Sequence, residues 1–182
     1  MEKFETTVTP LSEAELHEPL RDILAYWRDM QGTDAMPDWR QFDWLKIPSK
    51  YIPLSTVTDI ITMDPLELRY RFFGSKCVWI MGGEYTGLTT NDVKDESMRE
   101  KMLSETAQVI ACGAPTHLQT TIVMTSQFET EKQDYQCLRL PFCDHQTKRI
   151  HNILSVRSLS PEAVTLLHRK MGISTQRPRS RF

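Results

Sequence analysis

Residues 69–75, RYRFFGS, and residues 83–88, GEYTGL, contain the pattern that decides the fold of this chain. The first segment predicts a strand that ends at Phe73, and a cluster of glycines follows it. Four of the seven glycines in the chain lie in this region, at Gly74, Gly82, Gly83 and Gly87. Glycine lets the backbone turn where a Cβ would clash. We therefore predict a corner over residues 74–87, where the chain passes from a strand into short helical structure.

The segments on both sides of this corner predict an antiparallel sheet. A β-branched segment at residues 57–63 ends at the turn pair Asp64-Pro65 and predicts a hairpin with the strand that ends at Phe73. A helix is expected from about residue 95 to 111, followed by strands at 116–127, 135–142 and 150–156. This order has too few strand–helix–strand alternations for a parallel, doubly wound sheet. The expected fold class is α+β, with a five-stranded antiparallel sheet and short helices on one face.

The N-terminal part predicts an amphipathic helix. Residues 12–15, SEAE, have the form of a capping box, and apolar residues then recur at intervals of three and four as far as a glycine stop at Gly32. The apolar series, here called the Leu16–Met30 seam, is Leu16, Leu20, Ile23, Trp27 and Met30. The seam can pack on its own domain or pair with a second copy, and both alternatives stay open. The expected division is an N-terminal leader and helix at 1–32, the sheet domain at 33–159, and a C-terminal helix with a basic disordered tail at 160–182.

Composition and charge limit the classes of function. The chain has 182 residues, of which 40% are hydrophobic and 25% charged, as expected for one globular domain. A net charge of −2 makes a nucleic-acid partner unlikely, although the basic residues of 169–182 leave the role of the tail open. No apolar run is long enough to cross a membrane, and the first residues do not resemble a secretory signal. We expect a cytoplasmic protein with reduced cysteines.

Motifs that carry known chemistry are missing from the sequence. Neither of the two common glycine-rich phosphate-binding loops can be written, and no nucleophile elbow of the form G-x-S-x-G occurs. The group Cys137, Cys143, His145 and His151 has the ligand types of a zinc site but lacks the short spacing of a zinc knuckle. We therefore predict no metal site and no catalytic residue.

The aromatic and sulfur-containing residues between 70 and 85 are the remaining unusual feature. Core packing accounts for most of them, and a pocket for a small apolar molecule is the sharper hypothesis, because ligand cavities are mostly apolar with few polar groups. The residues predicted to line such a pocket are Phe73, Trp79, Met81, Met102, Ile122 and Leu138.

The sequence resembles the PAS-domain family, in particular the stand-alone PAS proteins of proteobacteria. The resemblance covers about residues 20–159 and is carried by Tyr26-Trp27, Pro37, residues 69–75 and 83–88, Leu140-Pro141 and residues 150–156. It implies a sensory or ligand-binding module that passes a change on through terminal helices. The cofactor stays unknown: residues 75–79 do not match the flavin-binding cysteine motif, and residues 88–112 contain no histidine to bind haem.

Three hypotheses about function follow from the sequence. The first is a PAS-type sensory or protein-interaction module in signal transduction that has no enzymatic activity and passes its signal to an unknown partner, with a homodimer expected. The second is a small enzyme working in a cavity of the sheet, for which Asp59, His117 and His151 are the candidates on strands. The third is a dimerisation scaffold that uses the Leu16–Met30 seam.

Overall fold

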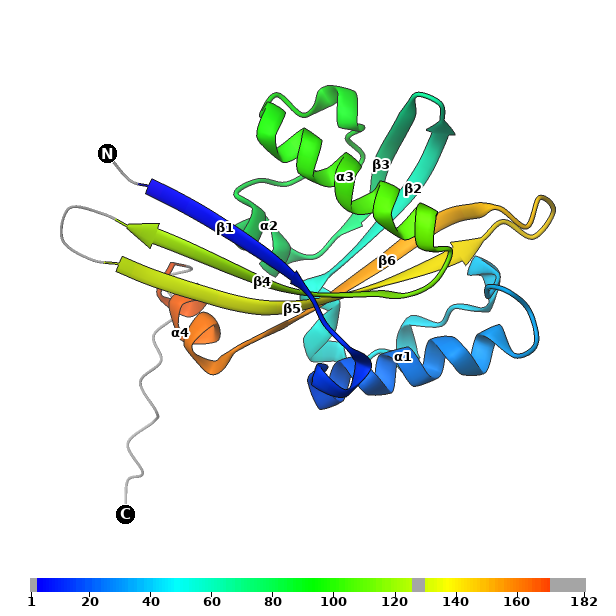
Figure 1. Ribbon diagram of the computed structural model, residues 1–182, viewed down its shortest axis with the longest axis horizontal. Coiled ribbons are helices and arrows are strands. Elements are labelled where there is room, and N and C mark those ends of the chain that lie inside the picture. The colour runs from blue at the N-terminus through cyan, green and yellow to red at the C-terminus, as the bar shows by residue number, and fades with distance from the viewer. Residues whose placement is uncertain (1–2, 126–129, 171–182) are drawn as a thin grey trace, which may run out of the picture.

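The computed structural model describes residues 3–125 and 130–170, with side chains described for residues 7–121 and 134–165. In these ranges the fold is α+β, built on one antiparallel sheet of six strands in the order β1-β4-β5-β6-β2-β3 (Figure 1). The strands are β1 (Lys3–Pro10), β2 (Ser55–Met63), β3 (Leu66–Phe73), β4 (Thr116–Thr125), β5 (Thr130–Cys143) and β6 (Ile150–Leu159).

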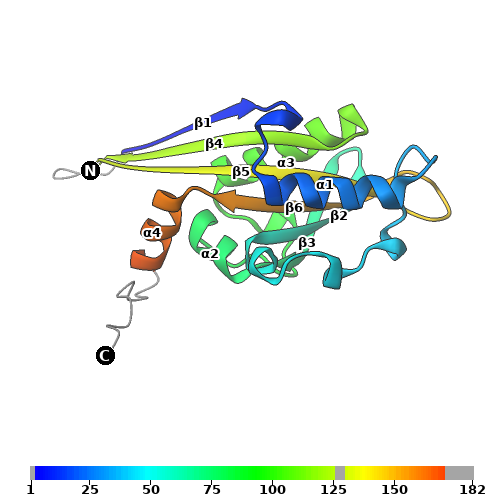
Figure 2. The same ribbon diagram turned by 90° about the horizontal axis from the view of Figure 1, so that it is seen from below.

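The helices lie on both faces of this sheet. They are α1 (Glu18–Gln31), α2 (Ser75–Met81), α3 (Glu96–Cys112) and α4 (Pro161–Lys170), with short 3-10 turns between them. Figures 1 and 2 show α1 on one side of the sheet and α3 on the other. The glycine stop is confirmed, since Gly32 ends α1 with a φ of 53°. The capping box at residues 12–15 is present but caps a 3-10 turn, and α1 begins after it, at Glu18. At the start of α3, the Asp95 side chain accepts from the Met98 backbone.

The sheet contains one strand more than the sequence predicts. Residues 3–10 are strand β1, which pairs antiparallel with the outer edge of β4 from Lys3 opposite Thr125 to Pro10 opposite Leu118. The leader predicted at the N-terminus is therefore wrong over these residues. Backbone hydrogen bonds to β4 hold this strand, and such an edge pairing leaves little trace in the hydrophobic pattern.

Each face of the sheet has its own core, because alternate residues of a strand point to opposite faces. The face toward α1, here called the α1 face, buries Val57, Leu138, Leu140 and Phe142 against α1 and residues 33–54. The Leu16–Met30 seam packs into this same core, so the structure selects the first of the two alternatives for it, packing on its own domain. The opposite face, here called the α3 face, is covered by α2 and α3.

The predicted corner after Phe73 is confirmed. Two of its positions require glycine, each for a different physical reason. A Cβ at Gly74 would lie 2.4 Å from the carbonyl oxygen of Pro53, so the close approach of two backbones requires glycine there. Gly82 has a φ of 75° and ends α2 in the left-handed conformation. The corner thereby holds α2 against the α3 face.

Candidate functional site

Two arginines on neighbouring strands are the outstanding polar residues of the α3 face. In the β5–β6 register Cys137 lies opposite Arg157, and Arg139 lies opposite Ser155. The period of two places all four side chains on the same face, the one that α2 and α3 cover. Arg139 is 6% exposed and Arg157 is 5% exposed. A fully charged side chain is seldom buried so deeply without a partner.

Arg157 is bonded in an unusual way. Its Nη1 donates to the Sγ of Cys77 at 3.4 Å and its Nη2 to the Sδ of Met81 at 3.6 Å, both in α2. Its buried Nε has no hydrogen-bond partner among the described residues. Thiol and thioether sulfurs are weak acceptors, and removing one ion from water costs several kcal/mol when no opposite charge compensates it. These contacts leave most of that cost in place.

Arg139 has an ion pair that satisfies part of its guanidinium. Its Nη2 donates to the carboxylate of Glu105 in α3 at 2.5 Å, while its buried Nη1 has no partner among the described residues. The Arg139 side chain is 7% exposed and that of Glu105 is 20% exposed. Glu105 therefore sits at the border between the buried guanidinium and solvent.

Neighbouring groups do not supply the missing negative charge. Burial raises the pKa of Tyr70 to about 12, and burial also raises the pKa of the Cys77 thiol, although the Arg157 charge acts in the opposite direction. Both groups are consequently neutral at pH 7. The described part of this region thus holds two guanidinium charges against the one carboxylate of Glu105.

An aromatic and sulfur-rich cluster adjoins the arginines. The rings of Tyr70 and Phe73 meet edge to face at a centroid distance of 5.1 Å, and Phe73 meets Tyr85 at 5.4 Å. Cys77 and Met102 are buried in the same cluster, with Met81 partly buried against it. Polarisable groups beside unpaired donors are the surroundings expected for a small-molecule site. We call the arginines, Glu105 and this cluster the interior site.

The structure brings together three of the six pocket residues predicted from the sequence. Phe73, Met81 and Met102 lie in the interior site. Trp79 is 47% exposed, and Leu138 lies in the core of the α1 face. The side chain of Ile122, in β4, lies outside the described residues. Whether any of these residues binds a ligand stays a prediction.

Sequence reasoning missed Arg139 and Arg157. Both interrupt apolar strand segments, LRLPF at 138–142 and ILSVRSL at 153–159. A charged residue on a strand in an otherwise buried segment was the signal that could have identified them. On a strand that is exposed on one face, however, the same alternation places an arginine in water.

A cavity of about 330 Å³ lies beside Glu105, between α3 and the edge of the sheet formed by β1 and β4. We call it the edge pocket. Its apolar wall consists of Val8, Pro10 and Leu118. Its polar wall comes from α3 and consists of Lys101, Ser104, Glu105 and Gln108. Glu105 thus contacts the edge pocket and Arg139 at once.

The three residues proposed for an enzyme do not converge on one site, although His151 precedes Asn152, the residue opposite Asp59 on β6. Asp59 is buried, accepts from the Asn152 amide at 2.7 Å, and pairs with Arg69 at 3.1 Å and Arg71 at 2.9 Å. His117 is on β4, separated from β2 by two strands, and burial lowers its pKa. His151, on β6, is exposed. The carboxylate of Asp59 is bound to two arginines and an amide.

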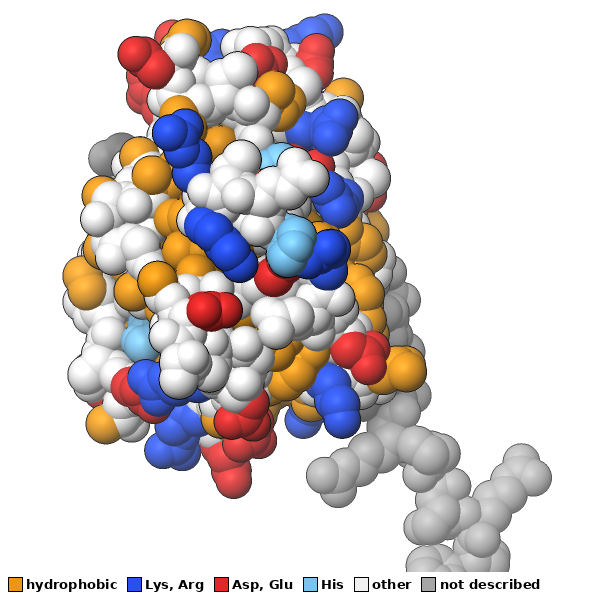
Figure 3. All heavy atoms as spheres, turned by 90° about the vertical axis from the view of Figure 1, so that its right-hand side faces the viewer, with side chains coloured by type: hydrophobic (Ala, Val, Ile, Leu, Met, Phe, Trp, Pro, Cys, Tyr) orange, Lys and Arg blue, Asp and Glu red, His pale blue; other side chains and the backbone are white. Residues whose placement is uncertain are grey.

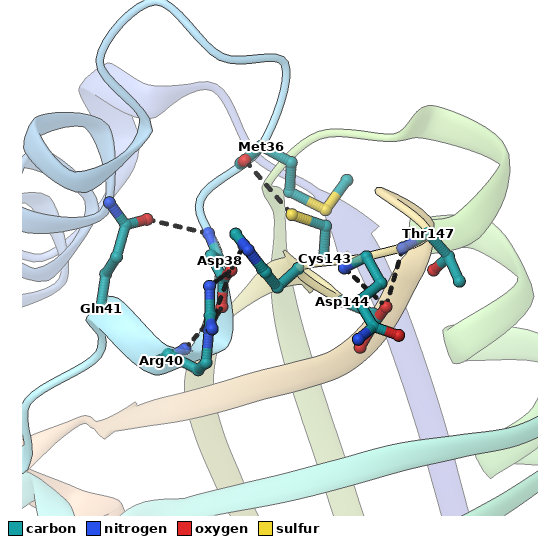
Figure 4. A network of polar contacts seen from close by, with 9 residues as sticks. Met36, Asp38, Arg40, Gln41, Cys143, Asp144 and Thr147 are labelled. Atoms are coloured by element: carbon teal, nitrogen blue, oxygen red, sulfur yellow. Dashed lines mark hydrogen bonds and ion pairs between the residues drawn. The ribbon is translucent and has the colours of Figure 1, made fainter.

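A second charged site lies at the end of the sheet, where the β5–β6 loop meets residues 34–41. Asp38 pairs with Arg40 at 3.0 Å and with the Nδ1 of His145 at 3.0 Å. Figure 4 shows Arg40 and Gln41 directed at Asp38, and the Cys143 thiol directed at the backbone carbonyl of Met36.

Figure 3 shows Lys and Arg side chains gathered around a histidine and an acidic side chain on this end of the molecule. The hydrogen bond from Arg40 lowers the pKa of Asp38 to about 2, despite the opposing effect of burial. A shallow cavity of about 400 Å³ opens here. Asp38, Arg40 and His145 in its wall are paired with one another, which distinguishes this end of the sheet from the interior site.

The described part of the chain lacks two further features, a cluster of metal ligands and a membrane span. There, no three histidine, cysteine or acidic side chains are grouped as a metal ion would need. In the same ranges, no helix combines the length and apolar character required to cross a bilayer.

Comparison with known proteins gives likenesses of structure only. No family model and no curated protein matches the sequence. The PAS domain of the histidine kinase ThkA has 14% identity and a TM-score of 0.36, covering 57% of this chain and 98% of its own. A light-oxygen-voltage domain studied with a flavin analogue has 12% identity and a TM-score of 0.36, covering 66% and 87%.

An RNA-binding light-oxygen-voltage receptor is similar over 93% of this chain and 43% of its own, with 12% identity and a TM-score of 0.41. All three solved structures carry a PAS or light-oxygen-voltage description. At these TM-scores the likeness carries no argument about this chain, and a proposal of function has to rest on the residues of the interior site.

Proposed function

We propose that this chain is a sensory module of a signalling pathway that binds a small molecule at the interior site. The observation that carries the proposal is Arg157, a buried guanidinium whose acceptors are the sulfurs of Cys77 and Met81 and whose Nε has no partner among the described residues. A ligand acceptor placed there would satisfy donors that the chain itself leaves open.

The position of Arg157 also connects binding to the short helix α2. Its two sulfur contacts come from α2, which is a helix of seven residues between Gly74 and the left-handed Gly82. A ligand that takes over the guanidinium would release Cys77 and Met81, and the position of α2 would change with occupancy. This is the kind of local change that a signalling partner can read.

Native mass spectrometry and an absorbance scan of freshly purified protein test the proposal. We expect the wild-type chain to carry a bound molecule that is lost in Arg157→Met. Arg149→Met is the matched control, because Arg149 is an exposed arginine just before β6. A ligand that stays bound in Arg157→Met places the site elsewhere. The proposal is contradicted if no molecule is bound and no member of a metabolite library raises the melting temperature.

The narrower features expected from the sequence remain part of this proposal. They are membership of the stand-alone PAS proteins of proteobacteria, a cytoplasmic location, and signalling without enzymatic activity. A homodimer is proposed as well, and it would use a surface other than the Leu16–Met30 seam, since the seam is buried in its own chain. Sedimentation of the chain with and without ligand measures whether dimers form.

A further inference from the structure

Glu105 lies where a ligand carboxylate would lie. Its side chain makes the one ion pair that Arg139 has among the described residues, it is 20% exposed, and it forms part of the wall of the edge pocket. Arg139 keeps a second buried donor, Nη1, without a partner in the described residues. The carboxylate is therefore held at one border of a buried cation, with an open cavity on its other side.

The edge pocket lies on the same face of the sheet as both arginines, and Glu105 in its wall is the ion-pair partner of Arg139. Leu118 on β4 forms part of the wall of the edge pocket and lies opposite Cys137 on β5. Cys137 in turn lies opposite Arg157 on β6. Neighbouring strands are about 4.8 Å apart, so Leu118 and Arg157 are separated by about 10 Å across the sheet. A molecule in the edge pocket contacts Glu105, behind which lies the buried guanidinium of Arg139.

The walls of the edge pocket define the chemical class of that molecule. Val8, Pro10 and Leu118 offer an apolar surface, and Lys101 adds a positive charge one helical turn before Glu105. The positive charges of Lys101 and Arg139 favour an anionic ligand. The apolar wall on the opposite side favours a ligand that also has a short hydrocarbon chain. A neutral apolar molecule would leave the donors of Arg139 as they are.

We propose that Glu105 is a displaceable internal counter-ion, and that the ligand is a small organic carboxylate that enters through the edge pocket and takes the place of Glu105 at Arg139. This inference deepens the proposed function and rests on it. Because Glu105 is tethered to α3 near Arg139, it competes at a high effective concentration and weakens binding in the wild-type chain. Its displacement would move a buried contact between α3 and β5.

Binding of hexanoate, with hexanamide as its uncharged analogue, tests this inference by calorimetry on the full chain. Glu105→Gln keeps the shape of the side chain but removes the competing charge, and we expect it to bind hexanoate at least tenfold more tightly than the wild type. Glu100→Gln is the matched control, since it removes the same charge from an exposed position on α3. Its affinity should equal that of the wild type.

A second substitution keeps the test valid if one variant folds poorly. In the Glu105→Gln background, Arg139→Lys keeps the charge but removes the forked donor, and hexanoate binding should fall at least tenfold. The inference is overturned if Glu105→Gln binds no more tightly than Glu100→Gln, or if hexanamide binds as well as hexanoate. A neutral molecule that co-purifies with the chain and depends on Arg157 would uphold the proposed function while refuting this inference.

Discussion

Replacement of Arg157 by methionine should stabilise the ligand-free protein. The guanidinium is 5% exposed and its contacts are two sulfur acceptors at 3.4 and 3.6 Å. Weak hydrogen bonds of this kind contribute at most about 1 kcal/mol each, whereas burial of the ion costs several kcal/mol. Methionine is unbranched and apolar, and it can pack against Cys77 and Met81. We expect the free energy of unfolding to rise by about 1–3 kcal/mol, within the range known for replaced buried ions.

Urea denaturation of protein refolded from denaturant measures this change without a bound ligand. A gain of about 1–3 kcal/mol corresponds to a rise in melting temperature of about 2–12 °C for a chain of this size. Arg139→Met is the contrasting variant, because it leaves the Glu105 carboxylate without its partner and should lower stability by about 1–3 kcal/mol. A loss of more than about 1 kcal/mol in Arg157→Met would refute the view that Arg157 is retained for binding.

Three other substitutions test the framework around the site. Asp38→Asn should lower the free energy of unfolding by about 1–2 kcal/mol at pH 7, because the pKa of Asp38 in the folded protein, about 2, lies below its usual value of 3.8. Urea titrations should show this difference from the wild type vanish as the pH falls from 4 to 2. Gly74→Ala places a Cβ 2.4 Å from the Pro53 carbonyl oxygen and should cost about 2–4 kcal/mol, so an unchanged thermal midpoint would contradict the clash. Trp27→Phe loses the buried 2.8 Å hydrogen bond to the Pro141 carbonyl and should lower the free energy of unfolding by about 1–3 kcal/mol. Chemical denaturation measures this loss, and a value outside that range would contradict the reasoning.

Local patterns predicted most of the secondary structure. The capping residue Asp95, the stop at Gly32 and the turn pair before β3 are each encoded within a few neighbouring residues. Strand β1 was not predicted, because it is held by pairing with β4, more than a hundred residues further along the chain. The pairing partner of an edge strand cannot be read from the strand's own composition.

The interior site was only half predicted because both faces of this sheet are buried. Leu138, Leu140 and Phe142 alternate along β5 and form one apolar face, which packs against α1. The intervening residues, Cys137 and Arg139, face α3. In a half-exposed strand these would be solvent-facing positions, so the ordinary rule assigns a polar residue there to water. Helices α2 and α3 reverse that assignment by covering the second face, so Arg157 is buried beneath α2 and Arg139 is buried against α3. The regular apolar residues of β5 thus mark the core of the α1 face. The proposed ligand site lies on the α3 face, formed by the alternate residues, which the hydrophobic pattern does not identify as buried.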